Sequence, residues 1–210
     1  MEQLKKIKLI NEVGIDPSRY MCELAKKKGI NTEELFFNLK TSRLIKKKYG
    51  LFDLIYGANV FNHIDDPYNF INGCKNLLKP NGILILEFPD LDQLLKKNSF
   101  DTIYHEHRNY YSKLSLLKIL KKVDINIIKF EKLEYMSGSL RIYVKNSRFK
   151  KIIFKEKKIS ENVKKFNDFK LKIQLIRDKL LNFIKKKKEE GKIIVGFGAA
   201  TKGNTLLNFC

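Results

Sequence analysis

The sequence predicts an α/β protein whose mainly parallel sheet is covered by helices on both faces. Short apolar runs alternate with amphipathic segments along the first half of the chain. Turn signals separate these segments, such as the Lys-Pro-Asn-Gly run at residues 79–82. Polar side chains follow several of the apolar runs, at the strand ends where such sheets bind ligands.

Four apolar runs are the expected strands of this sheet: residues 8–15, 34–37, 52–56 and 83–88. The segments between them have helical periodicity and residues typical of helix starts, with Pro17 and Ser18 before one and Pro67 opening another. The expected helices are residues 19–28, 40–48 and 67–78. Strands that alternate with helices in this way predict parallel pairing.

The pattern changes after residue 112. Residues 114–121 are an expected helix, and residues 125–133 and 139–144 are expected strands of a small β insertion, paired antiparallel. Residues 155–190 have apolar positions every three or four residues, which predicts a long, lysine-rich amphipathic helix. Residues 192–197 restart the α/β pattern with a strand, from which a glycine-bearing turn leads into another helix.

The net charge of +20 suits a nucleic-acid binder or a protein of anionic membrane surfaces. However, the lysines lie mainly on polar faces of the expected helices, without an aromatic-interleaved basic groove or a recognition helix. No apolar run reaches membrane-spanning length. We therefore expect neither a nucleic-acid partner nor a membrane partner, and the basic field favours a small anionic substrate.

The cysteines are few and widely spaced, at Cys22, Cys74 and Cys210. This spacing predicts neither a disulfide framework nor a cysteine zinc site. The first residues contain no apolar region of a signal peptide. A reducing cytoplasm is the expected location, and no metal is expected in the site.

Residues 101–112 read D-T-I-Y-H-E-H-R-N-Y-Y-S and hold two of the three histidines of the chain. His105 and His107 flank Glu106, and tyrosines lie on both sides of this group. Titratable groups gather at functional sites, but also in structural networks. Two interpretations therefore remain: a catalytic site, and a solvated loop whose aromatic side chains pack on a neighbouring helix.

Three polar residues stand at the ends of expected strands, namely Asp16, Asn59 and Glu87. In doubly wound sheets, an acid between a strand and the following helix holds the ribose hydroxyls of a nucleotide-like cofactor. Asp16 is the candidate for this role, although an Asp before Pro-Ser is also a common turn or cap residue.

The glycine-bearing turn near the carboxyl end offers backbone N–H groups and a favourable helix dipole to a phosphate. Lys202, Asn204 and Thr205 are candidate side-chain donors beside it. It does not fit the Walker A pattern, and tight helix–sheet packing is the alternative explanation.

Five motifs occur in a fixed order along the chain: G-I-D-P-S, F-D-L-I-Y-G-A-N-V-F-N-H-I-D-D, F-D-T-I-Y-H-E-H-R-N-Y-Y-S, G-S-L-R-I-Y-V and G-F-G-A-A-T-K-G-N-T-L-L-N. Together they resemble the sugar C-methyltransferases, S-adenosylmethionine-dependent enzymes that methylate a carbon of a nucleotide-linked keto-sugar. The I-Y-H-E-H and K-G-N-T-L-L-N motifs are the most specific. The resemblance covers nearly the whole chain and implies a Rossmann-like class I methyltransferase sheet, S-adenosylmethionine as cofactor and a nucleotide-diphosphate sugar as substrate.

The resemblance also implies roles for individual residues. The catalytic group is His107 as general base with Tyr104 and Glu106 beside it. The cofactor residues are Asp16 at the ribose and Asn59, Val60 and His63 towards the methionine end. The substrate residues are Tyr111, Arg141, Lys202, Asn204 and Thr205.

The implied chemistry suits these residue types. A carbon next to a ketone must lose a proton before it can attack a methyl group, and imidazole is the usual base near neutral pH. Tyrosine hydroxyls can donate hydrogen bonds to the enolate oxygen, and a carboxylate can orient or tune the imidazole. Transfer of a methyl group to carbon in this way needs no metal.

The chain departs from the family pattern at both ends. The cysteine-rich zinc domain, the first strand and the glycine-rich loop of the family are missing, and Met136-Ser137 stand where the family has His-Gly. We therefore expect a partial methyltransferase domain (1–150), a helical connector (151–190) and the start of a nucleotide-sugar-binding α/β domain (191–210). The alternative to an active enzyme is a non-catalytic fragment whose cofactor pocket needs a separate chain to supply the missing region.

Overall fold

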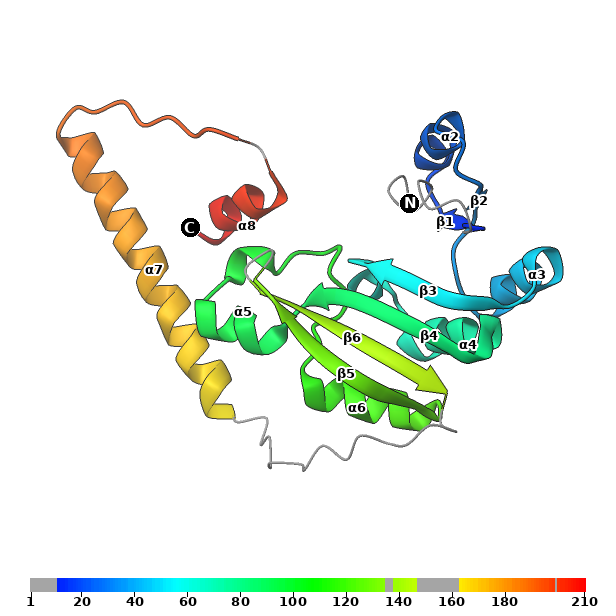
Figure 1. The fold of residues 1–210 in the computed structure, drawn as a ribbon. Helices are drawn as coiled ribbons and strands as arrows, with labels where there is room; N and C mark the ends of the chain where they lie inside the picture. The colour runs from blue at the N-terminus through cyan, green and yellow to red at the C-terminus, as the bar shows by residue number, and fades with distance from the viewer. Residues whose placement is uncertain (1–10, 135–137, 147–162, 199) are drawn as a thin grey trace. The chain divides into compact units, whose positions relative to one another are not determined.

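The structure is a computed structural model that describes residues 11–134, 138–146, 163–198 and 200–210 (Figure 1). Its α/β class confirms the prediction. None of the helices in these ranges is long and apolar enough to cross a membrane. The chain divides into two compact units, one made of residues 1–55 and 66–84 and the other of residues 56–65 and 85–210.

The strands form two separate sheets. β1 (Gly14–Asp16) pairs in parallel with β2 (Thr32–Glu34). A four-stranded sheet has the order β3-β4-β6-β5, from β3 (Phe52–Ala58), β4 (Leu78–Pro89), β5 (Ile125–Leu133) and β6 (Ser139–Asn146). β3 and β4 point the same way and β6 the opposite way (Figure 1), and β5 and β6 are antiparallel as expected. The two sheets are separate because the described residues contain no strand that pairs with both β1 and β3, and the family's first strand is the one that the sequence lacks.

The predicted helices form close to their expected positions. They are α2 (Arg19–Lys27), α3 (Leu39–Tyr49), α4 (Pro67–Leu77), α6 (Lys113–Lys122), α7 (Val163–Glu189) and α8 (Thr201–Phe209). Four of them begin after a side chain that accepts a hydrogen bond from the first turn, from Ser18, Asn38, Asp66 and Ser112. A further helix, α5 (Leu91–Lys97), was not predicted; its seven residues are too few for a clear periodicity.

Two expected strands are corrected. The strand expected at residues 34–37 lies earlier, at β2. Residues 192–197 have no regular structure, and Ile193 is 92% exposed. Their apolar composition suits a strand, but a strand also needs a hydrogen-bonded neighbour, and the described residues provide none for this segment. Residues 8–10 of the first expected strand and 155–162 of the long expected helix lie outside the described residues.

In the first unit, α3 packs against α4. Ile45 of α3 and Ile71 and Cys74 of α4 are buried. The amide of Asn76 donates to the hydroxyl of Ser42 over 3.0 Å, so the pair is also joined by a hydrogen bond.

The two faces of the four-stranded sheet have opposite character because side chains alternate along each strand. One face is apolar and packs on α6. Its buried members are Leu86, Phe88, Leu140, Ile142 and Val144, with Leu116 and Leu120 from α6. The other face, which we call the polar face, carries Tyr56, Glu87, Glu131, Arg141 and Tyr143.

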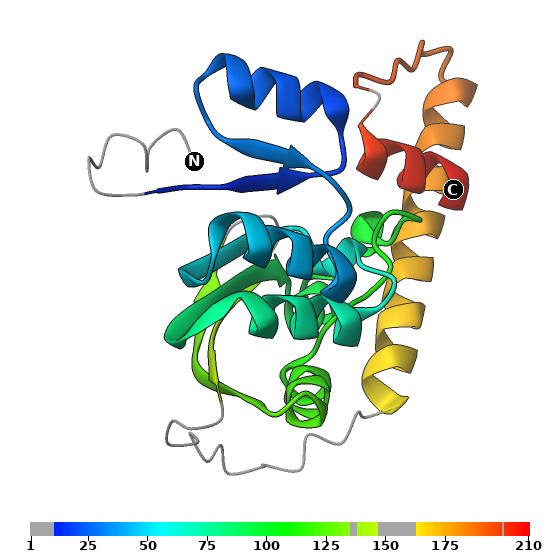
Figure 2. The ribbon, with the colours of Figure 1, turned by 90° about the vertical axis from the view of Figure 1, so that its right-hand side faces the viewer.

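A second, smaller core joins α5, α7, α8 and a short 3-10 helix, η2 (Phe100–Thr102). Leu94, Phe100 and Phe169 are buried there. The ring of Phe209 lies 5.0 Å from that of Phe100, and Arg177 of α7 donates to the Phe209 carbonyl. These contacts place α8 beside both α7 and η2 (Figure 2).

Removing the Leu116 side chain tests the core between α6 and the apolar face. We expect Leu116→Ala to lower the free energy of unfolding by about 2–5 kcal/mol, because it leaves a cavity in a closed site. Leu171→Ala, on the exposed side of α7, is the control and should change it by less than about 0.5 kcal/mol. Urea unfolding measures both, and equal losses would contradict this assignment of the core.

Candidate functional site

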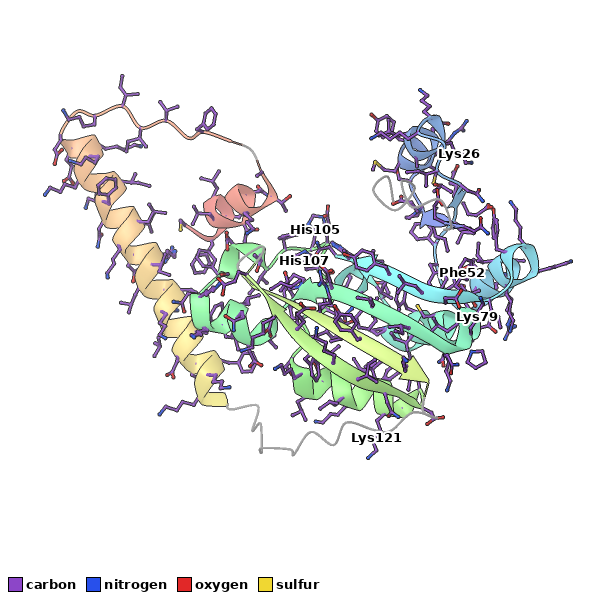
Figure 3. The ribbon with its side chains drawn as sticks, viewed as in Figure 1. Lys26, Phe52, Lys79, His105, His107 and Lys121 are labelled. Atoms are coloured by element: carbon purple, nitrogen blue, oxygen red, sulfur yellow. The ribbon has the colours of Figure 1, made fainter. Side chains whose placement is uncertain are left out.

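The segment of residues 101–112, here called the histidine loop, is fixed at both ends. It begins in η2 and ends at Ser112, which caps α6 through a reciprocal pair of hydrogen bonds with Ser115. Tyr111 forms a parallel bridge with Asp90, at the end of β4. Figure 3 shows His105 and His107 on this loop. The loop therefore lies at the carboxyl end of a strand, where the sequence predicts a site.

The imidazole of His107 makes two hydrogen bonds that fix its protonation. Its Nδ1 lies 2.9 Å from the carbonyl oxygen of Thr102, and its Nε2 lies 2.8 Å from the hydroxyl oxygen of Tyr104. A carbonyl can only accept, so Nδ1 must carry the proton. In the neutral ring Nε2 is then the acceptor of the Tyr104 O–H. The loop thus presents a basic nitrogen whose partner is a hydroxyl.

His63 lies against this pair. Its ring centroid is 5.0 Å from that of His107, in an edge-to-face arrangement. Its Nδ1 lies 2.7 Å from the carbonyl oxygen of Glu106, so this nitrogen also carries a proton. His63 belongs to η1 (Phe61–His63), which follows β3. The sequence predicts His63 at the cofactor, and the structure places it beside the proposed base.

The surroundings of His107 favour its neutral form. Burial is the largest cause that lowers its pKa below the usual value, followed by the positive charge of His63. The bond to Thr102 and the charge of Glu106 act in the opposite direction, and Lys202 lowers the pKa further. The net result is a pKa below 6.5, so His107 is a free base at neutral pH.

Glu106 acts on His107 at a distance. Its exposed carboxylate lies 4.0 Å from Nε2 of His105, whose side chain is 87% exposed. The hydrogen bond that connects Glu106 to the site comes from its backbone carbonyl, which accepts from His63. Glu106 therefore tunes the pKa of His107 by its charge and holds His63 by its backbone.

Two groups beside the site, the Thr102 carbonyl and the Asn62 side chain, are absent from the residues predicted from the sequence. The carbonyl of Thr102 accepts from His107 and also from the hydroxyl of Tyr110, over 3.1 Å. Asn62 is 2% exposed, and neither polar atom of its side chain has a partner within the described residues. A backbone carbonyl could not be found by residue type, whereas Asn62 stands inside the quoted N-V-F-N-H-I run.

The polar face carries a connected set of charges. One oxygen of Glu87 accepts from the Tyr56 hydroxyl over 2.8 Å and from Nε of Arg141 over 2.7 Å. Nη1 of Arg141 donates to Glu131 over 3.2 Å, and the hydroxyl of Tyr143 donates to the same oxygen of Glu131. Glu87 is only 8% exposed, so its charge is balanced by Arg141 in a half-buried ion pair.

A pocket of about 500 Å³ lies over this set of charges. Asn59 lines it together with Tyr56, Glu87 and Arg141. Asn59 has a left-handed backbone with φ of 52°, and its N–H donates to the Glu87 carbonyl over 2.8 Å. Val60 follows and is partly exposed. The predicted cofactor residue Asn59 and the predicted substrate residue Arg141 thus share one pocket.

Asp16 lies in the other unit, at the end of β1, where the sequence places it. One oxygen of its carboxylate accepts from the Ser18 N–H over 2.8 Å, which supports the start of α2. The second oxygen makes no hydrogen bond within the described residues. Asp16 is therefore a turn residue, and it still has an acceptor for a ligand hydroxyl.

Tyr111 is corrected from a substrate residue to a core residue. It is 3% exposed, and its hydroxyl donates to the Phe61 carbonyl over 3.2 Å. Its ring stacks on that of Phe61 at 4.6 Å and meets the ring of Phe88 at 5.3 Å. Burial raises the pKa of its hydroxyl far above the usual value.

The three predicted substrate residues near the carboxyl end all lie on α8. The positive charge of Lys202 is the smallest of the causes that lower the pKa of His107. Thr205 donates to the Thr201 carbonyl, and the side chain of Asn204 accepts from Asn208. Asn204 and Thr205 thus form hydrogen bonds within their own helix.

Known proteins resemble this chain in sequence. The family described as a methyltransferase domain matches residues 4–129, and the one described as a C-methyltransferase C-terminal domain matches residues 135–210. C-methyltransferase NovU of Streptomyces niveus is 29% identical over 207 residues, which cover 94% of this chain and 49% of NovU. The chain thus spans about half the length of this curated relative.

Solved structures resemble it in fold. A SAM-dependent methyltransferase from Archaeoglobus fulgidus has a TM-score of 0.52 at 16% identity, over 69% of this chain and 80% of that one. The plantazolicin methyltransferase BpumL, solved with SAH, has a TM-score of 0.51 at 12% identity, over 68% and 70%. Identities this low support the fold alone. Because the methyltransferase-domain family matches more than half of the sequence, the chain belongs to that family.

Proposed function

We propose that this chain acts as a C-methyltransferase, which moves a methyl group from S-adenosylmethionine to a carbon next to a ketone of a nucleotide-diphosphate sugar. The observation that carries this proposal is the neutral imidazole of His107, which has its proton on Nδ1 and a hydroxyl partner at Nε2. A base of this kind serves to remove a proton from carbon. The match to the C-methyltransferase C-terminal domain and to NovU supports transfer to carbon.

His107 is the base in this proposal. Nε2 takes the proton from the carbon next to the ketone, and the electrons of the C–H bond move into the enolate. The imidazolium that forms keeps its Nδ1 bond to the Thr102 carbonyl. As Nε2 takes up a proton it ceases to accept from Tyr104, whose O–H then donates to the enolate oxygen. Burial and the charge of Glu106 raise the pKa of Tyr104, so its hydroxyl stays protonated for this task.

The residues present fit S-adenosylmethionine. Asp16 keeps a carboxylate oxygen for a ribose hydroxyl at the end of a strand, the usual place for such an acid. Asn59 and Val60 follow β3, and Asn59 faces a pocket. When bound, S-adenosylmethionine supplies an electrophilic sulfonium methyl group. In this proposal His63 supports the base instead of contacting the cofactor, since its Nδ1 is bonded to Glu106.

The second candidate function is that of a non-catalytic fragment, which needs a separate chain to complete its cofactor pocket. The observation in its favour is that β3 is an edge strand among the described residues and that Leu54 on it is half exposed. An open edge of this kind accepts a strand from another chain. Calorimetric titration of the purified chain with S-adenosylmethionine distinguishes the two candidates. An active enzyme binds the cofactor by itself, whereas a chain with an incomplete pocket does not.

Replacement of His107 tests the base. We expect His107→Ala to lower kcat for methyl transfer by about 10²–10⁴-fold, because the carbon then has no proton acceptor. His105→Ala is the matched control from the same loop and should keep nearly full activity, since His105 is exposed. The measurement is turnover with a thymidine-diphosphate keto-sugar. A His107→Ala enzyme with near-normal turnover would show that another group removes the proton.

The pH dependence of activity tests how neighbouring charges shift the pKa of His107. Activity requires the neutral ring, so it should fall as the pH drops through the pKa of His107, below 6.5. His63→Asn removes a positive charge and should move this fall to higher pH, whereas Glu106→Gln removes a negative charge and should move it to lower pH. Profiles of kcat/KM and NMR titration of the His107 ring measure both shifts. Shifts in the same direction would contradict the arrangement.

A further inference from the structure

The Thr102 carbonyl, which holds Nδ1 of His107, belongs to a single turn of 3-10 helix, η2. The N–H of Thr102 donates to the Ser99 carbonyl over 3.2 Å, and its hydroxyl donates to the same oxygen over 2.7 Å. A 3-10 turn has poorer hydrogen-bond geometry than an α-helix, and one turn has few bonds of its own. The direction of the Thr102 carbonyl therefore depends on what packs against η2.

Phe100 anchors η2 in the small core. It is 9% exposed, and the other buried side chains of this core come from α5 and α7. Phe209 of α8 packs on the same core, with its ring centroid 5.0 Å from that of Phe100 and the ring planes 51° apart. Tyr110 also packs there, and its hydroxyl donates to the Thr102 carbonyl over 3.1 Å. The carbonyl is thus tied to this core by its own turn and by a hydrogen bond.

The end of α8 is fixed by more than the Phe209 ring. Nε of Arg177 on α7 donates to the Phe209 carbonyl over 2.9 Å. Carbonyls in the last turn of a helix have no partner within it, and the helix dipole favours a cation there. At the start of α8, no side-chain hydrogen bond caps the helix, and residues 192–198 before it have no regular structure. The contacts at its end are therefore the ones that keep α8 docked.

We propose that α8 positions the catalytic base, with Phe209 and Arg177 acting on His107 through η2. While α8 is docked, the Thr102 carbonyl faces Nδ1 and keeps the proton there, so Nε2 stays the basic nitrogen. When α8 leaves the core, Phe100 loses a packing partner and η2 no longer holds this carbonyl in place. The imidazole then exchanges its proton between its two nitrogens. The proposal rests on the proposed function, which makes His107 the base.

The exchange of the His107 Nδ1 proton with solvent tests this role, and NMR measures it on the full chain without substrate. The proton exchanges only when its hydrogen bond opens, so the rate reports how often the Thr102 carbonyl moves away. We expect Phe209→Ala to speed exchange by about 100-fold, because it removes a ring from a packed core. Arg177→Met should speed it by about 10-fold, because it keeps the aliphatic stem and removes a charge-assisted hydrogen bond.

The double variant removes both contacts, and its kcat for methyl transfer should fall by about 10-fold because the base is misplaced. Leu207→Ala and Lys179→Met are the matched controls, on exposed positions of α8 and α7. They should change the exchange rate by less than about twofold. Arg177→Met leaves the apolar core intact, so it decides the question if Phe209→Ala does not fold.

Unchanged exchange in Arg177→Met and Phe209→Ala would overturn the positioning role. Exchange that rises equally in Leu207→Ala and Lys179→Met would also overturn it, because it would reflect a general loss of stability. If the wild-type chain transfers no methyl group, the proposed function fails, while the exchange rates still decide whether α8 positions the His107 ring.

Discussion

The hydrogen bond between Nδ1 of His107 and the Thr102 carbonyl is the constraint on which the site depends. It fixes the tautomer, and so decides that Nε2 is the basic nitrogen and that Tyr104 is its donor. The carbonyl can serve this purpose because η2 holds it at the start of the histidine loop, and η2 in turn packs in the core formed with α5, α7 and α8. A helix at the carboxyl end of the chain therefore supports a base that lies about a hundred residues earlier in the sequence.

The four-stranded sheet supports the histidine loop at the carboxyl end of β4. Its apolar face packs against α6 and stabilises the sheet, while its polar face carries one ion pair between the end of β4 and the start of β6. The backbone of Glu87 also holds Asn59, which opens the segment that carries His63 to His107. The pocket and the histidine loop are thus linked through a short stretch of chain after β3. Both lie where strands of this fold class present their ligands.

Much of this arrangement follows from local sequence signals. Caps and periodicity locate the helices, and the density of His, Glu and Tyr locates the histidine loop, because these signals act over a few residues. Features that depend on distant partners could not be predicted. The lack of a strand at residues 192–197 and the pairing of Glu87 with Arg141, 54 residues apart, both depend on which neighbour is present. The burial of Tyr111 could not be predicted either, since residue type alone does not distinguish a tyrosine of the core from a tyrosine of the site.

The protonation of His107 tests the central claim most directly, and ¹⁵N NMR of the imidazole nitrogens measures it in the resting protein. At a pH above the pKa of His107, the structure requires a proton on Nδ1 and a bare Nε2 that accepts a hydrogen bond from Tyr104. Tyr104→Phe should then shift the Nε2 resonance and leave the Nδ1 proton in place. A neutral ring with its proton on Nε2, or a ring still charged at neutral pH, would contradict the account, because neither could take a proton from carbon through that nitrogen.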